Sequence, residues 1–174
     1  DAQIAASEEV KSPTIEDRRR VEDLTSVLYP DDANYEGRIL RLKQEYFFTS
    51  AGIQSITRHY KKYDRPLNEI SEHIAIHIND THPAMCVAEF MRILLDKEHM
   101  DWDEAWQQTV KTMSYTNHTI MAEALEKWPV EMLAKVQPRI LQIIQEIDQR
   151  YALEQENKKD HDFIERTRII KDGM

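Results

Sequence analysis

Apolar residues recur with helical spacing through most of this chain. Between Arg38 and Tyr60 they stand at positions 39, 42, 46, 53, 56 and 60, on one face of an amphipathic helix. The same spacing predicts helices over residues 21–29, 83–98, 101–113 and 129–153, the last with a break at Pro138. A further helix is expected between Thr119 and Pro129. Residues 1–20 lack a clear period, and we expect a frayed lead segment there.

Two short segments have the pattern of strands. Ile74, Ile76 and Ile78 alternate with other residues over 73–78, which suits a buried parallel strand, and a second strand is expected over 113–116. Two predicted helices separate the strands, so the outline is that of a βαβ unit. We therefore expect an α/β fold that is predominantly helical, a βαβ-like fragment with a minimal parallel sheet and long helices.

Runs of polar side chains follow both predicted strands, over residues 79–82 and 115–119. One interpretation is ordinary turn and helix-cap chemistry, in which Asp80 or Thr81 accepts hydrogen bonds from free helix N–H groups, each worth about 1 kcal/mol. That interpretation leaves His82 unexplained. The alternative is a set of donors and acceptors for a hydroxyl-rich ligand such as a sugar, at the sheet edge where open α/β sheets bind ligands.

Composition limits the function further. The chain has 174 residues but only 3 Gly, which stand singly, so it has no Gly-rich loop of the kind that cradles phosphate. Its net charge of −9 argues against nucleic acid as a partner. No stretch approaches the ~20 apolar residues of a membrane span. The single Cys86 fits a reducing compartment, so we expect a cytoplasmic protein.

Two other chemistries stay open as alternatives. His73, His77, Asp80 and His82 could approach one another around a metal, as in a metal hydrolase. The chain has no H-E-x-x-H motif and no Cys cluster, however, so we expect no metal. Cys86 stands one helical turn after His82 and could form a nucleophilic pair with it, but its apolar surroundings favour a core role.

Several longer motifs occur in a fixed order. They are Leu28-Tyr-Pro-Asp-Asp, Glu36-Gly, Leu40-Arg-Leu-Lys-Gln-Glu-Tyr-Phe47, Ile78-Asn-Asp-Thr-His-Pro83, Tyr115-Thr-Asn-His-Thr119, Glu123-Ala-Leu-Glu-Lys-Trp-Pro129, Leu141-Gln-Ile-Ile and Glu146-Ile-Asp-Gln-Arg150. With these motifs the chain resembles the α-glucan (glycogen, starch or maltodextrin) phosphorylase family, in a pattern that looks bacterial. The resemblance identifies residues 21–153 as part of the N-terminal catalytic half and residues 154–174 as a charged tail towards the domain junction.

The resemblance implies a glycosyltransferase of carbohydrate metabolism. Family members transfer a glucosyl unit from α-1,4-glucan to phosphate, giving glucose 1-phosphate with retained configuration. They bind pyridoxal phosphate on a Lys of the C-terminal half, so no cofactor is expected on this chain, which we expect to be inactive alone. The partners of the intact enzyme would be α-1,4-glucan and phosphate, in a homo-oligomer. A non-catalytic helical oligomerisation or interaction module stays open as the alternative.

The resemblance also implies roles for residues near the start of the chain. Asp32 and Ala33 would lie in the mobile loop that gates the catalytic cleft, and Arg41 would follow on the next helix. Ala33 stands where the animal enzymes have Asn, and Asn34 stands where they have an aromatic residue.

Five residues after the strands would surround the sugar. Asp80 and His82 would lie near sugars on the acceptor side. Asn117 and His118 would lie beside the transferred glucosyl unit, with His118 facing its 6-hydroxyl, and Glu126 matches a nearby acidic position. This agrees with two polar loops at one sheet edge.

Overall fold

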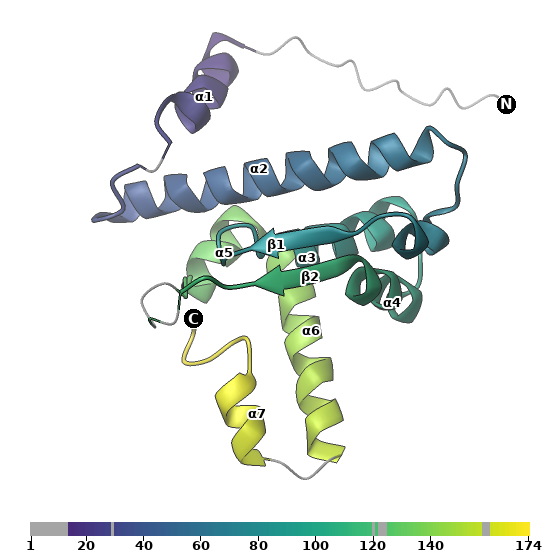
Figure 1. Cartoon of the computed structure of the whole chain (residues 1–174). Coiled ribbons are helices and arrows are strands. Elements are labelled where there is room, and N and C mark those ends of the chain that lie inside the picture. The colour runs from purple at the N-terminus through teal and green to yellow at the C-terminus, as the bar shows by residue number, and fades with distance from the viewer. Residues whose placement is uncertain (1–13, 29, 120, 122–124, 158–160) are drawn as a thin grey trace, which may run out of the picture. The chain divides into compact units, whose positions relative to one another are not determined.

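The computed structural model describes residues 14–28, 30–119, 121, 125–157 and 161–174 (Figure 1). The chain divides into two compact units, residues 1–41 and 42–174. In the first unit, α1 (Ile15–Ser26) begins six residues before the predicted helix start, so that start is wrong. Ile15 and Val21 are 86% and 59% exposed, so the charged residues of α1 form a helix by intrinsic propensity, which apolar spacing does not reveal. Tyr29, the predicted helix end, and residues 1–13 lie outside the described residues.

The long helix α2 (Tyr35–Lys61) confirms the clearest prediction from the sequence. Asn34 caps its first turn, because the Asn34 side-chain oxygen accepts a 2.8 Å hydrogen bond from the Gly37 N–H. Gly37 is needed at this point, since a β-carbon there would overlap the carbonyl oxygen of Asp31. The loop that leads into α2 is thus packed directly on the backbone of the helix.

The second unit contains the predicted βαβ arrangement. Strands β1 (Ile76–Asn79) and β2 (Met113–Thr116) lie side by side and run parallel, with Ile76 opposite Met113 and Asn79 opposite Thr116 (Figure 1). Between them run α3 (Cys86–Arg92), a π-helical turn η2 (Ile93–Lys97) and α4 (Trp102–Thr112). The register brings both carboxyl ends of the strands to the same sheet edge.

The first strand begins later than predicted. The 3₁₀-helix η1 (Leu67–Glu72) precedes it, and the N–H groups of His73 and Ile74 donate to the Ile70 carbonyl at 3.1 and 2.9 Å. These bonds hold residues 73 and 74 in a helical turn. The chain becomes extended only where Ile76 meets β2, so the predicted start at residue 73 is wrong.

The segment after β2 also differs from its prediction. Residues 117–119, 121 and 125–128 are not helical, so the helix expected before Pro129 is absent from the described part of that segment. The side-chain oxygen of Asn117 accepts the Thr119 N–H at 3.0 Å, a local contact that here is not followed by a helix in residues 117–119.

Three helices complete the second unit. They are α5 (Val130–Val136), α6 (Pro138–Asn157) and α7 (His161–Thr167). The break at Pro138 is confirmed, whereas regular structure continues past Leu153, because Ile164 of α7 is buried and α7 packs on α6. None of the helices in the described ranges combines the length and apolarity needed to cross a membrane.

The core of the second unit lies where α2, α3 and α6 meet the sheet. Its most buried large side chains are Tyr60, Ile70, Phe90, Met91, Leu94, Ile140 and Ile143. One charged residue, Glu89 on α3, is fully buried among them. Its carboxylate accepts hydrogen bonds from Tyr46 and Ser50 of α2, both at 2.8 Å, and from Arg92 at 2.7 and 2.8 Å. This network fixes the middle of α2 on α3.

Candidate functional site

The polar loops that follow β1 and β2 are hydrogen-bonded to each other at the carboxyl edge of the sheet. The Asp80 N–H donates to the Thr116 carbonyl at 2.9 Å, which continues the strand ladder. In return, the Asp80 carboxylate accepts the backbone N–H of His118 at 2.9 Å. His118 Nε2 lies 2.6 Å from the side-chain oxygen of Asn79. The structure therefore brings the predicted residues Asp80, Asn117 and His118 together.

The backbone of Asp80 has the left-handed conformation, with φ of 59°. Asp and Asn tolerate this region better than other residues with a β-carbon, because their short polar side chains bond locally. Here the conformation turns the chain away from β1 and directs the carboxylate to the second loop. The Asn79 contact also fixes the imidazole of His118. With an oxygen as acceptor, Nε2 carries the hydrogen, and Nδ1 is an acceptor in the neutral ring.

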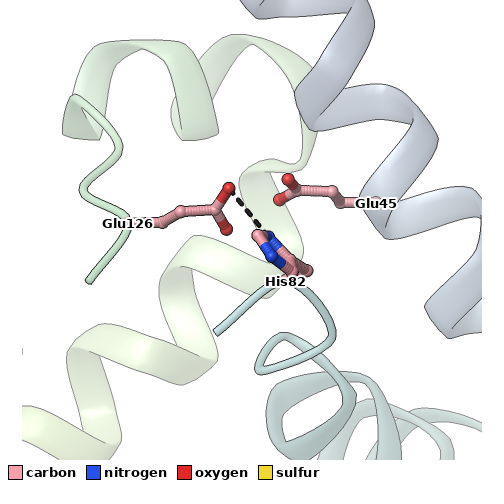
Figure 2. A group of neighbouring side chains, drawn as sticks. All are labelled: Glu45, His82 and Glu126. Atoms are coloured by element: carbon pink, nitrogen blue, oxygen red, sulfur yellow. Dashed lines mark ion pairs between the residues drawn. The ribbon is translucent and has the colours of Figure 1, made fainter. Parts of the chain in front are cut away.

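A second group of side chains lies beside this edge and is shown in Figure 2. His82 Nδ1 forms a 3.0 Å ion pair with Oε1 of Glu126, which brings these two predicted site residues together. Glu45 of α2 points toward the same place, and one ligand atom from each of the three residues lies within 4.8 Å of the others. The side chain of Glu126 is only 16% exposed, whereas that of His82 is 50% exposed.

Sequence reasoning missed Glu45. It lies in a motif of the long helix, but nothing in the spacing of α2 indicates which of its acidic residues faces the strand loops. Only the packing inside the second unit, to which Glu45 belongs, places it beside residues 37 and 81 positions further along the chain. A contact of that sequence separation has no local signal.

The predicted gate residues belong to the first unit. Arg41 Nη1 lies 3.4 Å from an oxygen of Asp32, in a pair whose acidic side chain is 55% exposed. The N–H of Ala33 donates to the Asp31 side chain at 3.0 Å. The loop is thus held by short-range polar contacts, which are weak when solvated.

The two alternative chemistries lose support from the structure. His73 is exposed ahead of β1, and His77 Nδ1 contacts Ser114 at 3.2 Å, so the envisaged four-residue metal group does not form. Cys86 is 5% exposed, with Sγ 3.9 Å from the sulfur of Met113. Burial raises the pKa of the Cys86 thiol to about 11, which opposes thiolate formation. His82 is paired instead with Glu126.

Comparisons with known proteins cover most of the chain. A family model described as carbohydrate phosphorylase matches residues 3–174. Glycogen phosphorylase of Bacillus subtilis is 51% identical over 135 residues, 78% of the chain, and that of Haemophilus influenzae is 47% identical over 161 residues, 91% of the chain. The muscle form of Oryctolagus cuniculus is 48% identical over 143 residues, 78% of the chain.

The chain spans only 17–20% of the length of these relatives. Bacterial and animal relatives are similarly close to it, so a bacterial source stays a prediction.

Proposed function

Because the chain belongs to the carbohydrate phosphorylase family, we propose that it is part of an α-glucan phosphorylase and contributes the loops that hold the glucan. The reaction would be phosphorolysis of α-1,4-glucan to glucose 1-phosphate with retained configuration. The observation that carries the proposal is the bond between Asp80 and His118, since it joins the two polar loops into one surface. Glucan and phosphate would be the partners of the intact enzyme.

The loop residues have the chemistry that sugar hydroxyls require. The imidazole of His118 and the amide of Asn117 offer neutral donors and acceptors, and Asp80 holds their backbone in place. His82 and Glu126 offer a second polar group for a sugar on the acceptor side. Each hydrogen bond to a hydroxyl contributes about 1 kcal/mol, and more where it strengthens in the transition state.

The described residues do not offer a site for pyridoxal phosphate. A Schiff-base Lys is activated by a desolvated or specially charged pocket, whereas every described Lys here is exposed. The Gly content also leaves no phosphate loop. We therefore assign the cofactor to other parts of the parent enzyme, and we expect no phosphorolysis by this chain alone.

The proposal is tested in the full-length parent enzyme by His118→Ala and Asn117→Ala. Each change is expected to lower kcat/KM for glucan phosphorolysis about five- to tenfold per hydrogen bond lost, measured as glucose 1-phosphate released. His161→Ala, on an exposed site of α7, is the matched control. Unchanged kcat/KM in both loop variants would contradict the proposal, as would release of glucose 1-phosphate by the 174-residue chain alone.

One observation favours the alternative of a helical oligomerisation module. Phe47 and Phe48 on α2 are 40% and 50% exposed, which suits contact with a partner surface. In our proposal the parent enzyme is a cytoplasmic homo-oligomer, so self-association and catalysis are compatible. Light scattering on the chain and on a Phe47→Ser, Phe48→Ser variant tests the alternative. A monomer at all concentrations would contradict it.

A further inference from the structure

We propose that Glu45, His82 and Glu126 form a binding site for a divalent transition-metal cation, for which Zn²⁺ is the best match. The three residues supply one imidazole nitrogen and two carboxylate oxygens, all within 4.8 Å of one another (Figure 2). Ligand atoms of a tetrahedral Zn²⁺ lie about 3.4 Å apart when each bond is about 2.0–2.2 Å long. The 3.0 Å separation of His82 and Glu126 is close to that spacing, and the Glu45 oxygen would move closer when the ion binds.

The three ligands come from segments that are far apart in the sequence, one in a helix and two in loops. Glu45 stands in the middle of α2, where the neighbouring Tyr46 and Ser50 are bonded to the buried Glu89. His82 precedes α3, and Glu126 precedes α5. A cation bound here would therefore meet a site in which the His82–Glu126 pair is already formed and Glu45 completes the ligand set.

The local charge favours a cation. Two carboxylates converge on one imidazole, and Oε2 of Glu126 is buried.

The ligand set selects the kind of cation. Ca²⁺ and Mg²⁺ prefer six or more oxygen ligands, whereas Zn²⁺ accepts a mixture of imidazole and carboxylate. Sites with three protein ligands leave one position on Zn²⁺ for water. Since His82 is also a sugar-facing residue in the proposed function, a bound cation would compete with glucan for it. Metal binding by the chain itself does not depend on that function.

The test is titration of the purified 174-residue chain with ZnCl₂ by isothermal calorimetry, with circular dichroism to verify folding. We expect one ion per chain, and X-ray absorption should show one imidazole and two carboxylates. His82→Ala and Glu45→Gln should each weaken binding at least about tenfold, a loss that even changes outside the ligand shell produce. His161→Ala and Glu131→Gln change the same residue types at exposed positions of α7 and α5 and should bind as the parent does.

Three results would overturn the proposal. They are the absence of stoichiometric Zn²⁺ binding, binding that survives both ligand substitutions, and an equal loss of binding in the two controls. If His82→Ala alone perturbs folding, Glu45→Gln still decides the question, because it replaces a carboxylate by an amide of the same shape. Failure of the glucan proposal would instead appear as unchanged phosphorolysis in the loop variants, with Zn²⁺ binding intact.

Discussion

The carboxylate of Asp80 accepts the backbone N–H of His118, 38 residues further along the chain, in a 2.9 Å hydrogen bond. This bond connects the loop after β1 to the loop after β2. It depends on the left-handed backbone of Asp80, whose φ is 59°. The candidate sugar-binding surface is therefore organised by one residue that combines an unusual backbone with a long-range side-chain contact.

Asp80→Ala should destabilise the chain by about 2 kcal/mol. About 1 kcal/mol comes from the lost hydrogen bond, and about 1 kcal/mol from placing Ala in the left-handed region. Asp64 offers the matched control, because it is exposed and has φ of 52°. Asp64→Ala should lose only the about 1 kcal/mol of stability that comes from placing Ala in the left-handed region. Urea unfolding measures both, and equal losses would show that the contact with His118 contributes nothing.

Glu89→Ala should destabilise the second unit by about 3–5 kcal/mol. The change leaves the guanidinium of Arg92, whose side chain is only 18% exposed, without its carboxylate, and removal of one partner from a largely buried ion pair is strongly destabilising. Glu131→Ala, at an exposed position of α5, should stay within about 0.5 kcal/mol of the parent. A loss below about 1 kcal/mol in Glu89→Ala would mean that the network is dispensable.

The free energy of unfolding should fall on acidification, because buried carboxyl groups that are ionised in the folded chain become protonated. Burial by itself raises the pKa of Glu89, but hydrogen bonds from Arg92, Ser50 and Tyr46 outweigh it and hold the pKa below the ordinary 4.5. A lowered pKa in the folded state means that its contribution is complete above pH 4.5 and is lost as pH falls through the folded value.

The same reasoning applies to Asp148. Burial alone would raise the pKa of its carboxyl group. Hydrogen bonds from Arg168 and Ile169 hold its pKa below the ordinary 3.8. Unfolding midpoints in urea should therefore be flat at mildly acidic pH and decline below pH 4.5. Glu89→Gln should reduce the decline, and a stability that rises on acidification would contradict this assignment.

Cys86 should react slowly with iodoacetamide in the folded chain. The thiol is 5% exposed, and burial raises its pKa to about 11, so thiolate is scarce at neutral pH. Mass spectrometry should show alkylation that becomes fast only in denaturant. Rapid alkylation of the folded chain would revive the pairing of Cys86 with His82 as a nucleophile.

Gly37→Ala should disturb the loop before α2, because the added β-carbon would overlap the carbonyl oxygen of Asp31. Overpacking of this kind costs about 1–3 kcal/mol. Gly52→Ala is the control within the same helix: open space surrounds Gly52, so Ala should stabilise by about 0.5–1 kcal/mol. In thermal unfolding, Gly37→Ala should lower the midpoint temperature and Gly52→Ala should raise it. Equal shifts in the two variants would contradict the close packing of the loop.

The spacing of apolar residues in the sequence was sufficient to predict the main helices and strands of the core. The long apolar stripe of α2 and the two short strands with helices between them are local patterns. The fixed periods of helices and strands decide which residues share a face, so these patterns can be recognised without knowledge of the rest of the chain. The polar residues after each strand indicated the candidate site for the same reason, since parallel strands end at one edge.

Tertiary structure decided what local patterns do not contain. It shortened the first strand, because pairing begins only where Ile76 meets Met113, and it placed Glu45 beside His82 and Glu126. The sequence alone indicated the apolar stripe of α2, the two parallel strands and the polar residues that follow each strand. Folding decided which of them meet, since contacts between distant segments depend on packing and on burial of charge, and neither leaves a short-range signal.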